Sequence, residues 1–395
     1  MPTLIVDGRT VEAAEGASVL DVCRKLGVEI PTMCFLEGYE RFTSCMVCVV
    51  KDVRLDRLIP ACSARVTEGM IIETDGEEVR DGRRVALELL LSDHVGDCEG
   101  PCRRACPAGM NIPLMIRQLA RGDVAAAAAT VRRDIALPRT LGRICPAPCE
   151  KVCRRRGHDE AVSICLLKRF AGDHAPAVAG DDRETSGSAD GSPRPVAVVG
   201  AGPAGLAAAA ELRRLGRSCT LFEAAGRAGG ELRKSVEPGR LPRDVLDAEI
   251  DGILAMGVVL ETGCVLGGDL ALDDLLRRFG AVIVATGFAP ADSPPEFGLA
   301  VGQRGIEVER GTYRTSRTGV FAGGGAAGRG RRLAVRACAD GKEMARAADR
   351  HVRGATVVGA PAAFNSAIGP VSPEDIGEFL EGASGAARVL PGSSV

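Results

Sequence analysis

Aromatic residues are the scarcest class in this sequence: it has no tryptophan and two tyrosines, and aromatics fill only 3% of its 395 positions. A surface on which nucleic-acid bases stack is therefore not expected. The 50 basic and 52 acidic residues leave a formal charge of −2, which excludes a generally basic nucleic-acid binder and an acidic solvating tail. The longest apolar run, 196–210, is broken by glycine and proline and is too short to span a bilayer.

No signal peptide is visible where the chain opens, because its first residues read as a strand. We therefore expect a soluble, cytoplasmic protein. At about 150 residues per domain, its length predicts two or three domains. The 46% of hydrophobic residues are enough to fill sizeable cores.

Cysteine is abundant, and its distribution is uneven. Of the 15 cysteines, 12 lie between Cys23 and Cys165. Secreted disulfide scaffolds are usually short chains, whereas clustered cysteines in a long chain without a signal peptide indicate metal or cluster binding. The first half of the chain is therefore expected to hold metal centres.

Composition divides the chain into five blocks. The block 172–194 is rich in Gly, Ala, Ser, Pro and Asp, which indicates a linker. The predicted blocks are a strand-rich domain at 1–78, an Arg-rich helical domain at 79–171, this linker, a strand–turn–helix domain at 195–355 and a tail at 356–395.

The first cysteine set combines one close pair with two distant cysteines, in the spacing C-x10-C-x2-C-x13-C: Cys34, Cys45, Cys48 and Cys62. Thiolates this close can both reach one iron, and the distant cysteines close the cage from other segments. Strands are expected around the set at 3–6, 9–13, 48–53 and 70–74, with a helix at 18–26. This order predicts an α+β ferredoxin-like domain with a ubiquitin-like fold.

The spacing and the strand order resemble the N-terminal [2Fe-2S] domain of the large iron–sulfur subunit of NADH:quinone oxidoreductase. Related hydrogenase and formate dehydrogenase subunits share it. The resemblance implies one [2Fe-2S] cluster held by the four cysteines. A structural zinc site, which also takes four cysteines, is the alternative. Cys23 lies outside the set and is expected in the core.

The second cysteine-rich segment spaces His94, Cys98, Cys102 and Cys106 four residues apart. Its first half resembles the His-ligated [4Fe-4S] segment of the same large subunit, although the spacing here is C-x3-C-x3-C instead of C-x2-C-x5-C. From CPAGMNIP through GRICPAPCEKVCRRR to AVSICLLKRFAGD, the chain is similar to the helical domain of glutamate synthase small subunit and dihydropyrimidine dehydrogenase.

This resemblance implies an α-helical domain with two [4Fe-4S] clusters. One would use Cys98, Cys102 and Cys153, and the other Cys106, Cys145 and Cys149. Each group lacks one ligand.

In the family, the missing ligand of the second cluster is a Gln or Glu that aligns with Lys168. An ammonium group has no free lone pair, so Cys165, one helical turn earlier on the same face, is expected instead. His94 is expected to complete the first cluster and to raise its reduction potential. The alternatives are an exposed helix-end histidine for His94 and a core residue for Cys165.

A glycine-rich turn follows an apolar strand at 196–199 and opens an Ala-rich helix: Gly200, Gly202, Pro203, Ala204 and Gly205. The glycines permit a tight turn and close approach to a pyrophosphate, and the helix N-terminus favours the anion. Glu223, at the end of the next strand, is placed to accept from ribose hydroxyls. The pair Gly229–Gly230 is typical of FAD proteins. We therefore expect an α/β Rossmann-type FAD domain, the alternative being a structural turn without ligand.

The resemblance to glutamate synthase small subunit continues beyond this turn. It covers an Arg-Leu-Pro segment, AVIVATGFAP and TGVFAGGGAAG. It implies flavin contacts from one residue of the first segment and from two of each glycine-bearing turn: Leu241, Thr286, Gly287, Gly324 and Gly325.

Two departures from that family stand out. The closing motif normally carries an Asp where Gly325 stands. The family also inserts an NADPH-binding domain between the last two motifs, where only 288–320 lie here. A βαβ unit alone takes about 30 residues, so a nicotinamide domain is not expected in this segment.

These parts together predict a flavin and iron–sulfur subunit of a larger oxidoreductase. FAD, two [4Fe-4S] clusters and the [2Fe-2S] cluster would form an electron path, and no acid–base residue stands out as catalytic. The expected partner is another oxidoreductase subunit that binds NAD(P) or carries a substrate-reducing metal centre, as in a formate dehydrogenase or hydrogenase. The alternatives are a self-contained NAD(P)H:acceptor oxidoreductase and a non-catalytic relay scaffold without FAD.

Overall fold

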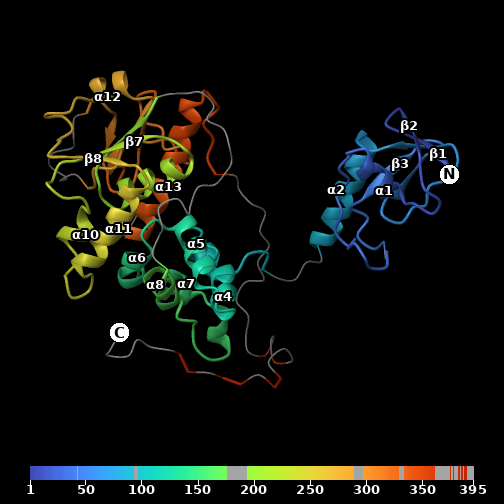
Figure 1. Cartoon of the computed structure of the whole chain (residues 1–395), viewed down its shortest axis with the longest axis horizontal. Coiled ribbons are helices and arrows are strands. Elements are labelled where there is room, and N and C mark those ends of the chain that lie inside the picture. The colour runs from blue at the N-terminus through green and yellow to red at the C-terminus, as the bar shows by residue number, and fades with distance from the viewer. Residues whose placement is uncertain are drawn as a thin grey trace. The chain divides into compact units, whose positions relative to one another are not determined.

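The computed structural model divides the chain into two compact units, Met1–Gly96 and Asp97–Val395 (Figure 1). It describes residues 1–41, 43–92, 97–175, 194–288, 297–328 and 333–360, together with 374, 377, 381, 382, 384, 385, 387 and 388. His94 and most of the predicted linker at 172–194 lie outside these residues. The predicted block boundaries stay predictions.

The first unit is a five-stranded mixed sheet with two helices. Its elements are β1 (Thr3–Val6), β2 (Arg9–Glu12), α1 (Val19–Lys25), β3 (Val49–Asp52), β4 (Arg57–Pro60), β5 (Met70–Glu73) and α2 (Glu77–Ser92). The strand order is β2-β1-β5-β3-β4, with β1 and β5 parallel and the other pairs antiparallel.

Helix α1 packs its apolar face against this sheet. Its N-terminus is held by a capping box, in which Ser18 accepts from the Asp21 N–H and Asp21 accepts from the Ser18 N–H. Cys23 is fully buried beside Leu4 and Leu20, which confirms it as a core residue.

The second unit begins with short helices. They are α3 (Pro101–Ala105), α4 (Ile112–Ala120), α5 (Val124–Asp134), α6 (Pro138–Ile144), α7 (Pro148–Lys151), the 3-10 helix η1 (Arg154–Gly157) and α8 (Ile164–His174). Prolines at the first turns of α3, α4, α6 and α7 favour helix starts there, because the proline nitrogen needs no intrahelical partner.

The remaining elements of the second unit are a five-stranded parallel sheet with its helices and a separate antiparallel pair of short strands, β10 and β11. In chain order, these elements are β6 (Val196–Val199), α9 (Pro203–Arg214), β7 (Cys219–Glu223), α10 (Glu231–Lys234), α11 (Arg243–Ala255), β8 (Val259–Thr262), α12 (Leu272–Arg278), β9 (Ala281–Val284), the short strands β10 (Val301–Gly302) and β11 (Gly305–Ile306), β12 (Val320–Ala322) and α13 (Ala334–Val352). The order β8-β7-β6-β9-β12 is the Rossmann-type order 3-2-1-4-5.

One apolar core joins the helical part of the second unit to one face of its parallel sheet. It joins Met115, Leu141 and Ile164 of the short helices to Val198 of β6 and Leu246 of α11. Figure 1 shows α6 beside α11, and α8 packs on α6. The opposite face of the sheet has a separate core, under α12. The helical part and the Rossmann-type part are therefore packed together, which positions their ligands relative to each other.

The predicted fold class is confirmed: a ferredoxin-like mixed sheet, a helical part and a Rossmann-type parallel sheet. None of the described helices is long and apolar enough to cross a bilayer.

Replacing Gly341 with Ala should destabilise the second unit. Helices α9 and α13 approach so closely that a Cβ at Gly341 would lie 2.1 Å from the carbonyl oxygen of Ala204. We expect a loss of about 1–3 kcal/mol in the free energy of unfolding, measured by urea titration followed by circular dichroism.

Gly252→Ala is the matched control. A Cβ at Gly252, inside α11, meets nothing within 4 Å, so the same change should stabilise by up to about 1 kcal/mol. Equal effects of the two substitutions would contradict the close approach of α9 and α13.

Candidate cluster and flavin sites

The β3–β4 hairpin brings two cysteines of the first set together. Cys48 directly precedes β3 and Cys62 follows β4, and the Ala61 N–H donates to the Cys48 carbonyl at 3.1 Å. The two thiols are in hydrogen-bond contact. Burial, its largest cause, raises the pKa of Cys48 to about 11.

The other two cysteines of the set meet in the loop before β3. The backbone N–H groups of Cys45 and Ser44 donate to the Cys34 sulfur, lower its pKa to about 7 and so stabilise its thiolate. The Cys45 thiol also contacts Cys34. Thr43 and Met46 have left-handed backbone conformations, with φ of 46° and 56°, which fold this loop around the thiols.

Two side chains that the sequence reasoning missed support this loop. Arg41 donates to the Cys62 carbonyl at 2.9 Å and forms an ion pair with Asp21 at 3.1 Å. The Thr43 hydroxyl lies 3.8 Å from the Cys62 sulfur. The four cysteines therefore meet as two thiol pairs, Cys34 with Cys45 and Cys48 with Cys62.

Cys98, Cys102 and Cys153, which we call the first thiol group, come from opposite ends of the helical part. Asp97 and Arg154, next to Cys98 and Cys153, form a two-pronged ion pair with distances of 2.9 and 3.0 Å. Burial raises the pKa of Cys102, and the nearby Cys153 and Cys106 thiols raise it further. The ion pair closes a loop of more than 50 residues and places the segments that carry Cys98 and Cys153 side by side.

Cys145, Cys149 and Cys165, which we call the second thiol group, lie at the ends of three helices. Cys145 caps α6, Cys149 is in α7 and Cys165 is in the first turn of α8. The Cys165 thiol is in hydrogen-bond contact with both Cys145 and Cys149. Contact with Cys145 lowers the pKa of Cys165, whereas contact with Cys149 and burial raise it, to about 11 in all.

The second thiol group is fixed by its own backbone and one carboxylate. Ala147, between two prolines, takes a left-handed conformation with φ of 50°, which turns the chain from Cys145 to Cys149. Glu150 accepts from the Cys165 N–H at 2.9 Å and forms an ion pair with Arg388. Cys106, expected in this group, interacts electrostatically with Cys102.

Among the described residues, no three His, Cys, Asp or Glu side chains surround a single ion position. In a [4Fe-4S] cluster each thiolate binds a different iron, so its ligands do not converge on one ion. The groups are therefore defined by the thiol contacts and by the helix ends that carry them.

The glycine-rich turn after β6 packs closely against its own backbone and against the loop after β9. A Cβ at Gly200, where φ is 104°, would lie 2.4 Å from the Ala285 carbonyl oxygen, and one at Gly205 would lie 1.8 Å from that of Gly200. Gly202 is the N-cap of α9, with Pro203 and Ala204 in its first turn. The pair Gly229–Gly230 packs on the same turn, since a Cβ at Gly230 would lie 2.9 Å from the Gly202 Cα.

Glu223, at the end of β7, has backbone partners. One carboxylate oxygen accepts from the Ala201 N–H at 2.8 Å, and the other accepts from the Ala225 N–H at 2.9 Å. The carboxylate therefore fixes the glycine-rich turn. Each oxygen keeps a second lone pair for a ribose hydroxyl.

The remaining predicted flavin residues follow the carboxyl ends of parallel strands. Thr286 and Gly287 follow β9, and Gly324 and Gly325 follow β12, so they meet at the edge of the sheet that bears the glycine-rich turn. Leu241 is fully buried in the adjoining core.

Asp340 of α13, which the sequence reasoning missed, accepts from the Gly324 N–H at 3.2 Å and from the Tyr313 hydroxyl at 2.9 Å. Gly325 packs directly on the other turn: a Cβ there would lie 2.8 Å from backbone atoms of Gly287 and Phe288. This contact accounts for glycine at the position where the resembled family has Asp.

Several contacts hold α6, the helix that leads to Cys145, against the Rossmann-type part. Both oxygens of Glu249 in α11 accept from the backbone at the start of α6, from Arg139 and Thr140, each at 2.7 Å. Arg240 donates to the Ile144 carbonyl at 3.1 Å, at the other end of α6. The helix that ends at Cys145 is thus fixed at both ends to the Rossmann-type part.

Cys338 of α13 lies between the two sites. Its thiol donates to the Pro203 carbonyl of the glycine-rich turn at 3.4 Å, and it also interacts electrostatically with Cys145. Burial raises the pKa of Cys338 to about 12, so it stays a neutral thiol. The second thiol group and the flavin turn are therefore neighbours.

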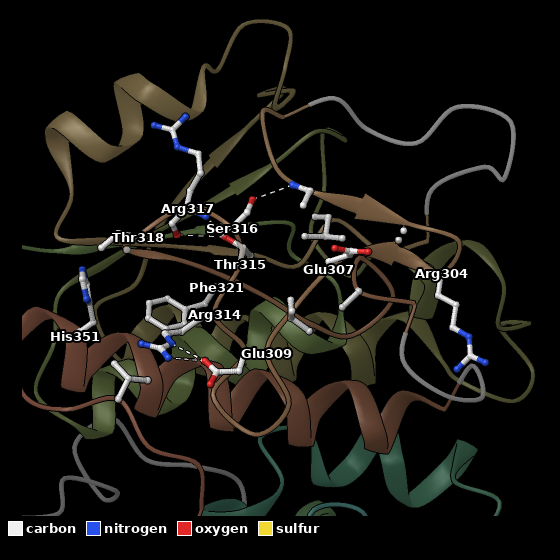
Figure 2. Close-up of a pocket in the computed structure, with 18 of the residues that line it drawn as sticks. Arg304, Glu307, Glu309, Arg314, Thr315, Ser316, Arg317, Thr318, Phe321 and His351 are labelled. Carbon is white, nitrogen blue, oxygen red and sulfur yellow. Dashed lines mark hydrogen bonds and ion pairs between the residues drawn. The ribbon is translucent and has the colours of Figure 1, made fainter.

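A separate pocket of about 910 Å³ lies beside β12 and the β10–β11 hairpin (Figure 2). Its lining includes Arg314, which pairs with Glu309 at 2.7 Å, and Arg317, which pairs with Asp273 at 2.6 Å. The Ser316 hydroxyl accepts from the Ala300 N–H. None of the predicted flavin residues lines this pocket.

Replacing Gly325 with Asp restores the residue of the resembled family, yet we expect it to disturb the site. The new Cβ would press on the backbone of Gly287 and Phe288, and the two turns would separate. Flavin per chain should fall by about twofold or more, and the thermal unfolding midpoint should fall with it.

The matched control is Gly239→Asp, because a Cβ at Gly239 meets nothing within 4 Å. A G325D chain with the flavin content and midpoint of the G239D chain would show that the two turns do not pack as described.

Three protein-family profiles match separate parts of the chain. The profile of a 2Fe-2S iron-sulfur cluster binding domain matches residues 2–77. The profile of dihydropyrimidine dehydrogenase domain II, 4Fe-4S cluster, matches residues 93–179. The profile of an NAD(P)-binding Rossmann-like domain matches residues 198–255.

Curated relatives are similar over about half of this chain. The NADP(+)-dependent formate dehydrogenase subunit beta of Moorella thermoacetica is 40% identical over 206 residues, covering 47% of this chain and 29% of the relative. The NADPH-Fe(3+) oxidoreductase subunit beta of Geobacter sulfurreducens is 37% identical over 194 residues, covering 47% and 28%.

The NAD-dependent dihydropyrimidine dehydrogenase subunit PreT of Salmonella typhimurium is 35% identical over 201 residues, covering 50% of this chain and 48% of the relative. The chain thus spans less than a third of the two beta subunits and about half of PreT. As the sequence predicts, the chain joins a [2Fe-2S] domain and a helical [4Fe-4S] domain to a Rossmann-type domain, and its homologues are subunits of oxidoreductases.

Proposed function

We propose that the chain is the flavin and iron–sulfur subunit of a multi-subunit oxidoreductase. It carries electrons between FAD, two [4Fe-4S] clusters, one [2Fe-2S] cluster and a partner subunit. The observation that carries this proposal is the place of Cys338, whose thiol donates to the glycine-rich turn and interacts electrostatically with Cys145. A flavin site and a cluster site that are both close to the same residue can exchange electrons directly.

The residues of the Rossmann-type edge fit a flavin dinucleotide. The start of α9 offers backbone N–H groups to a pyrophosphate, and Gly202 and Gly230 leave room for it. Glu223 keeps acceptor capacity for the ribose. When bound, FAD supplies the exchange of an electron pair for single electrons. The chain's own residues bind it, orient it and hold it beside the second thiol group.

The two thiol groups fit two [4Fe-4S] clusters. The second group, Cys145, Cys149 and Cys165, takes Cys106 as its fourth ligand in this proposal. The first group takes His94. Cys165 is supported as a ligand because its thiol contacts two other cysteines, whereas an apolar core position would give it none.

The thiol pairs of the first unit fit the two irons of a [2Fe-2S] cluster. Two sulfurs bound to one tetrahedral metal at about 2.3 Å lie just under 4 Å apart, which is the distance of a thiol–thiol hydrogen bond. We therefore assign Cys34 and Cys45 to one iron and Cys48 and Cys62 to the other. Zinc is the competing metal for this set.

The partner would supply the site for the two-electron substrate. Only 288–320 lie between the strand–turn motifs that flank a nicotinamide domain in the resembled family, too few for several βαβ units. The relatives that name a formate dehydrogenase or NADPH oxidoreductase subunit favour a partner of that kind. A second candidate is a self-contained NAD(P)H oxidoreductase, which the match to an NAD(P)-binding profile favours.

Anaerobic purification with metal, sulfide and flavin analysis tests the proposal. We expect about ten iron atoms and one FAD per chain, from one [2Fe-2S] and two [4Fe-4S] clusters. Zinc in place of iron would overturn the cluster assignment, and iron without flavin would favour a relay scaffold. Rapid bleaching of the flavin by NAD(P)H without any partner would favour the self-contained enzyme.

Replacing Cys165 with Ser should remove one cubane. We expect iron to fall from about ten to about six atoms per chain, and one paramagnetic resonance signal to disappear, because the second thiol group loses its central member. Cys264→Ser, which removes a thiol outside the proposed ligand set, is the control and should keep all the iron. Full iron content in C165S would reject Cys165 as a ligand.

A further inference from the structure

Lys168 is a buried cation in the wall of the second thiol group. It lies one turn after Cys165 on α8, and only 3% of its surface is exposed. It interacts electrostatically with Cys145, Cys165 and Cys338, and it favours the thiolate form of each. Its charge therefore acts on three thiols, at the end of α6, in α8 and in α13.

Other buried cations of the second unit have protein partners. Arg217 forms an ion pair with Asp349 at 2.6 Å, and Lys342 donates to the Ala108 carbonyl at 3.1 Å and pairs with Asp134. In the part of the chain that the structure describes, Lys168 forms no ion pair with a carboxylate. Glu150, which directly follows Cys149 of the second thiol group, already pairs with Arg388 and accepts from the Cys165 N–H.

A buried ammonium group without an anion is costly, since its charge is removed from water. A cubane bound by cysteine thiolates is an anion, and each electron that it accepts makes its charge more negative. Such a cluster at the second thiol group would supply the missing counter-charge. The burial of Lys168 then becomes favourable instead of costly.

We propose that Lys168 is the built-in counter-ion of the second [4Fe-4S] cluster and raises its reduction potential. The inference rests on the proposed function, because it requires a cluster at Cys145, Cys149 and Cys165. A nearby positive charge stabilises the reduced cluster more than the oxidised one. The effect is strong here because little water screens a buried charge. The cubane beside the flavin turn is therefore easier to reduce than it would be without the charge of Lys168.

The position of Lys168 in the sequence gives it this role. In the resembled family, a Gln or Glu at this position is itself a cluster ligand. Here Cys165 takes over as the proposed ligand one turn earlier, and the long side chain of Lys168 remains on the same helix face. Where the resembled family has a ligand, this chain therefore has a positive charge, which would act on the cluster without binding it.

The test is a redox titration of the anaerobic full-length chain, followed by paramagnetic resonance. Lys168→Met removes the charge and keeps much of the side-chain volume, while Lys168→Arg keeps the charge. We expect K168M to shift the one-electron reduction equilibrium of one cubane by about tenfold towards the oxidised form, which is about 59 mV in midpoint potential. K168R should stay within about twofold of the wild type.

Lys151→Met is the matched control, because Lys151 follows Cys149 by two residues but is exposed to solvent. Water screens its charge, so its removal should shift the equilibrium less than about twofold. An unchanged midpoint in K168M with full iron content would overturn the proposal, as would an equal shift in K151M.

Iron analysis separates the possible failures. If K168M loses the four irons of a cubane and K168R keeps them, the charge is needed to hold the cluster, which supports the counter-ion role. If K168R loses them as well, Lys168 acts through packing and the proposal fails. If the wild type itself holds only one cubane, the proposed function fails, and the counter-ion role fails with it because it requires the second cubane.

Discussion

The site depends on one buried carboxylate, that of Glu249. Its two oxygens take the first free N–H groups of α6, which are otherwise without partners at a helix N-terminus. Burial is the main influence on this carboxyl and raises its pKa, against the opposing hydrogen bonds from Thr140 and Arg139. Because α6 is short and ends at Cys145, fixing its start also fixes that thiol.

Helix α6 in turn fixes the position of α8. Arg139 and Arg143 of α6 both form ion pairs with Asp173 of α8, at 3.0 and 2.9 Å. These hold Cys165 and Lys168 against Cys145. One chain of contacts therefore runs from the Rossmann-type part through α6 to the helix that bears the last proposed ligand. The geometry of the second thiol group follows from packing between helices.

Much of this arrangement could be predicted from local sequence. The glycine-rich turn, its flanking strands and the cysteine spacings are local patterns, and each pattern leaves few backbone conformations open. Cys165 was expected near Cys145 because it lies one helical turn before Lys168, which aligns with a ligand of the resembled family. Its thiol does contact Cys145. Glu223 ends β7 beside this turn, and its backbone hydrogen bonds were not expected from the sequence.

The supporting contacts could not be predicted, because they join residues that are far apart in sequence. Asp97 meets Arg154, Glu249 meets the start of α6 more than a hundred residues away, and Asp340 meets Gly324. An ordinary acidic or basic residue in a helix carries no local signal of such a partner. Only the packing of the helices decides which of these charged residues meets a partner.

The short connection between β9 and β12 has a structural role of its own. Its described residues, 285–288 and 297–319, include the β10–β11 hairpin, which packs on the loop after β12: the Ile306 N–H donates to the Ala326 carbonyl at 2.9 Å. Gly305 faces the same carbonyl so closely that a Cβ would lie 2.4 Å away. The hairpin therefore braces the turn that carries Gly324 and Gly325. Because the hairpin packs on the loop that carries Gly324 and Gly325, it stabilises that edge of the proposed flavin site directly.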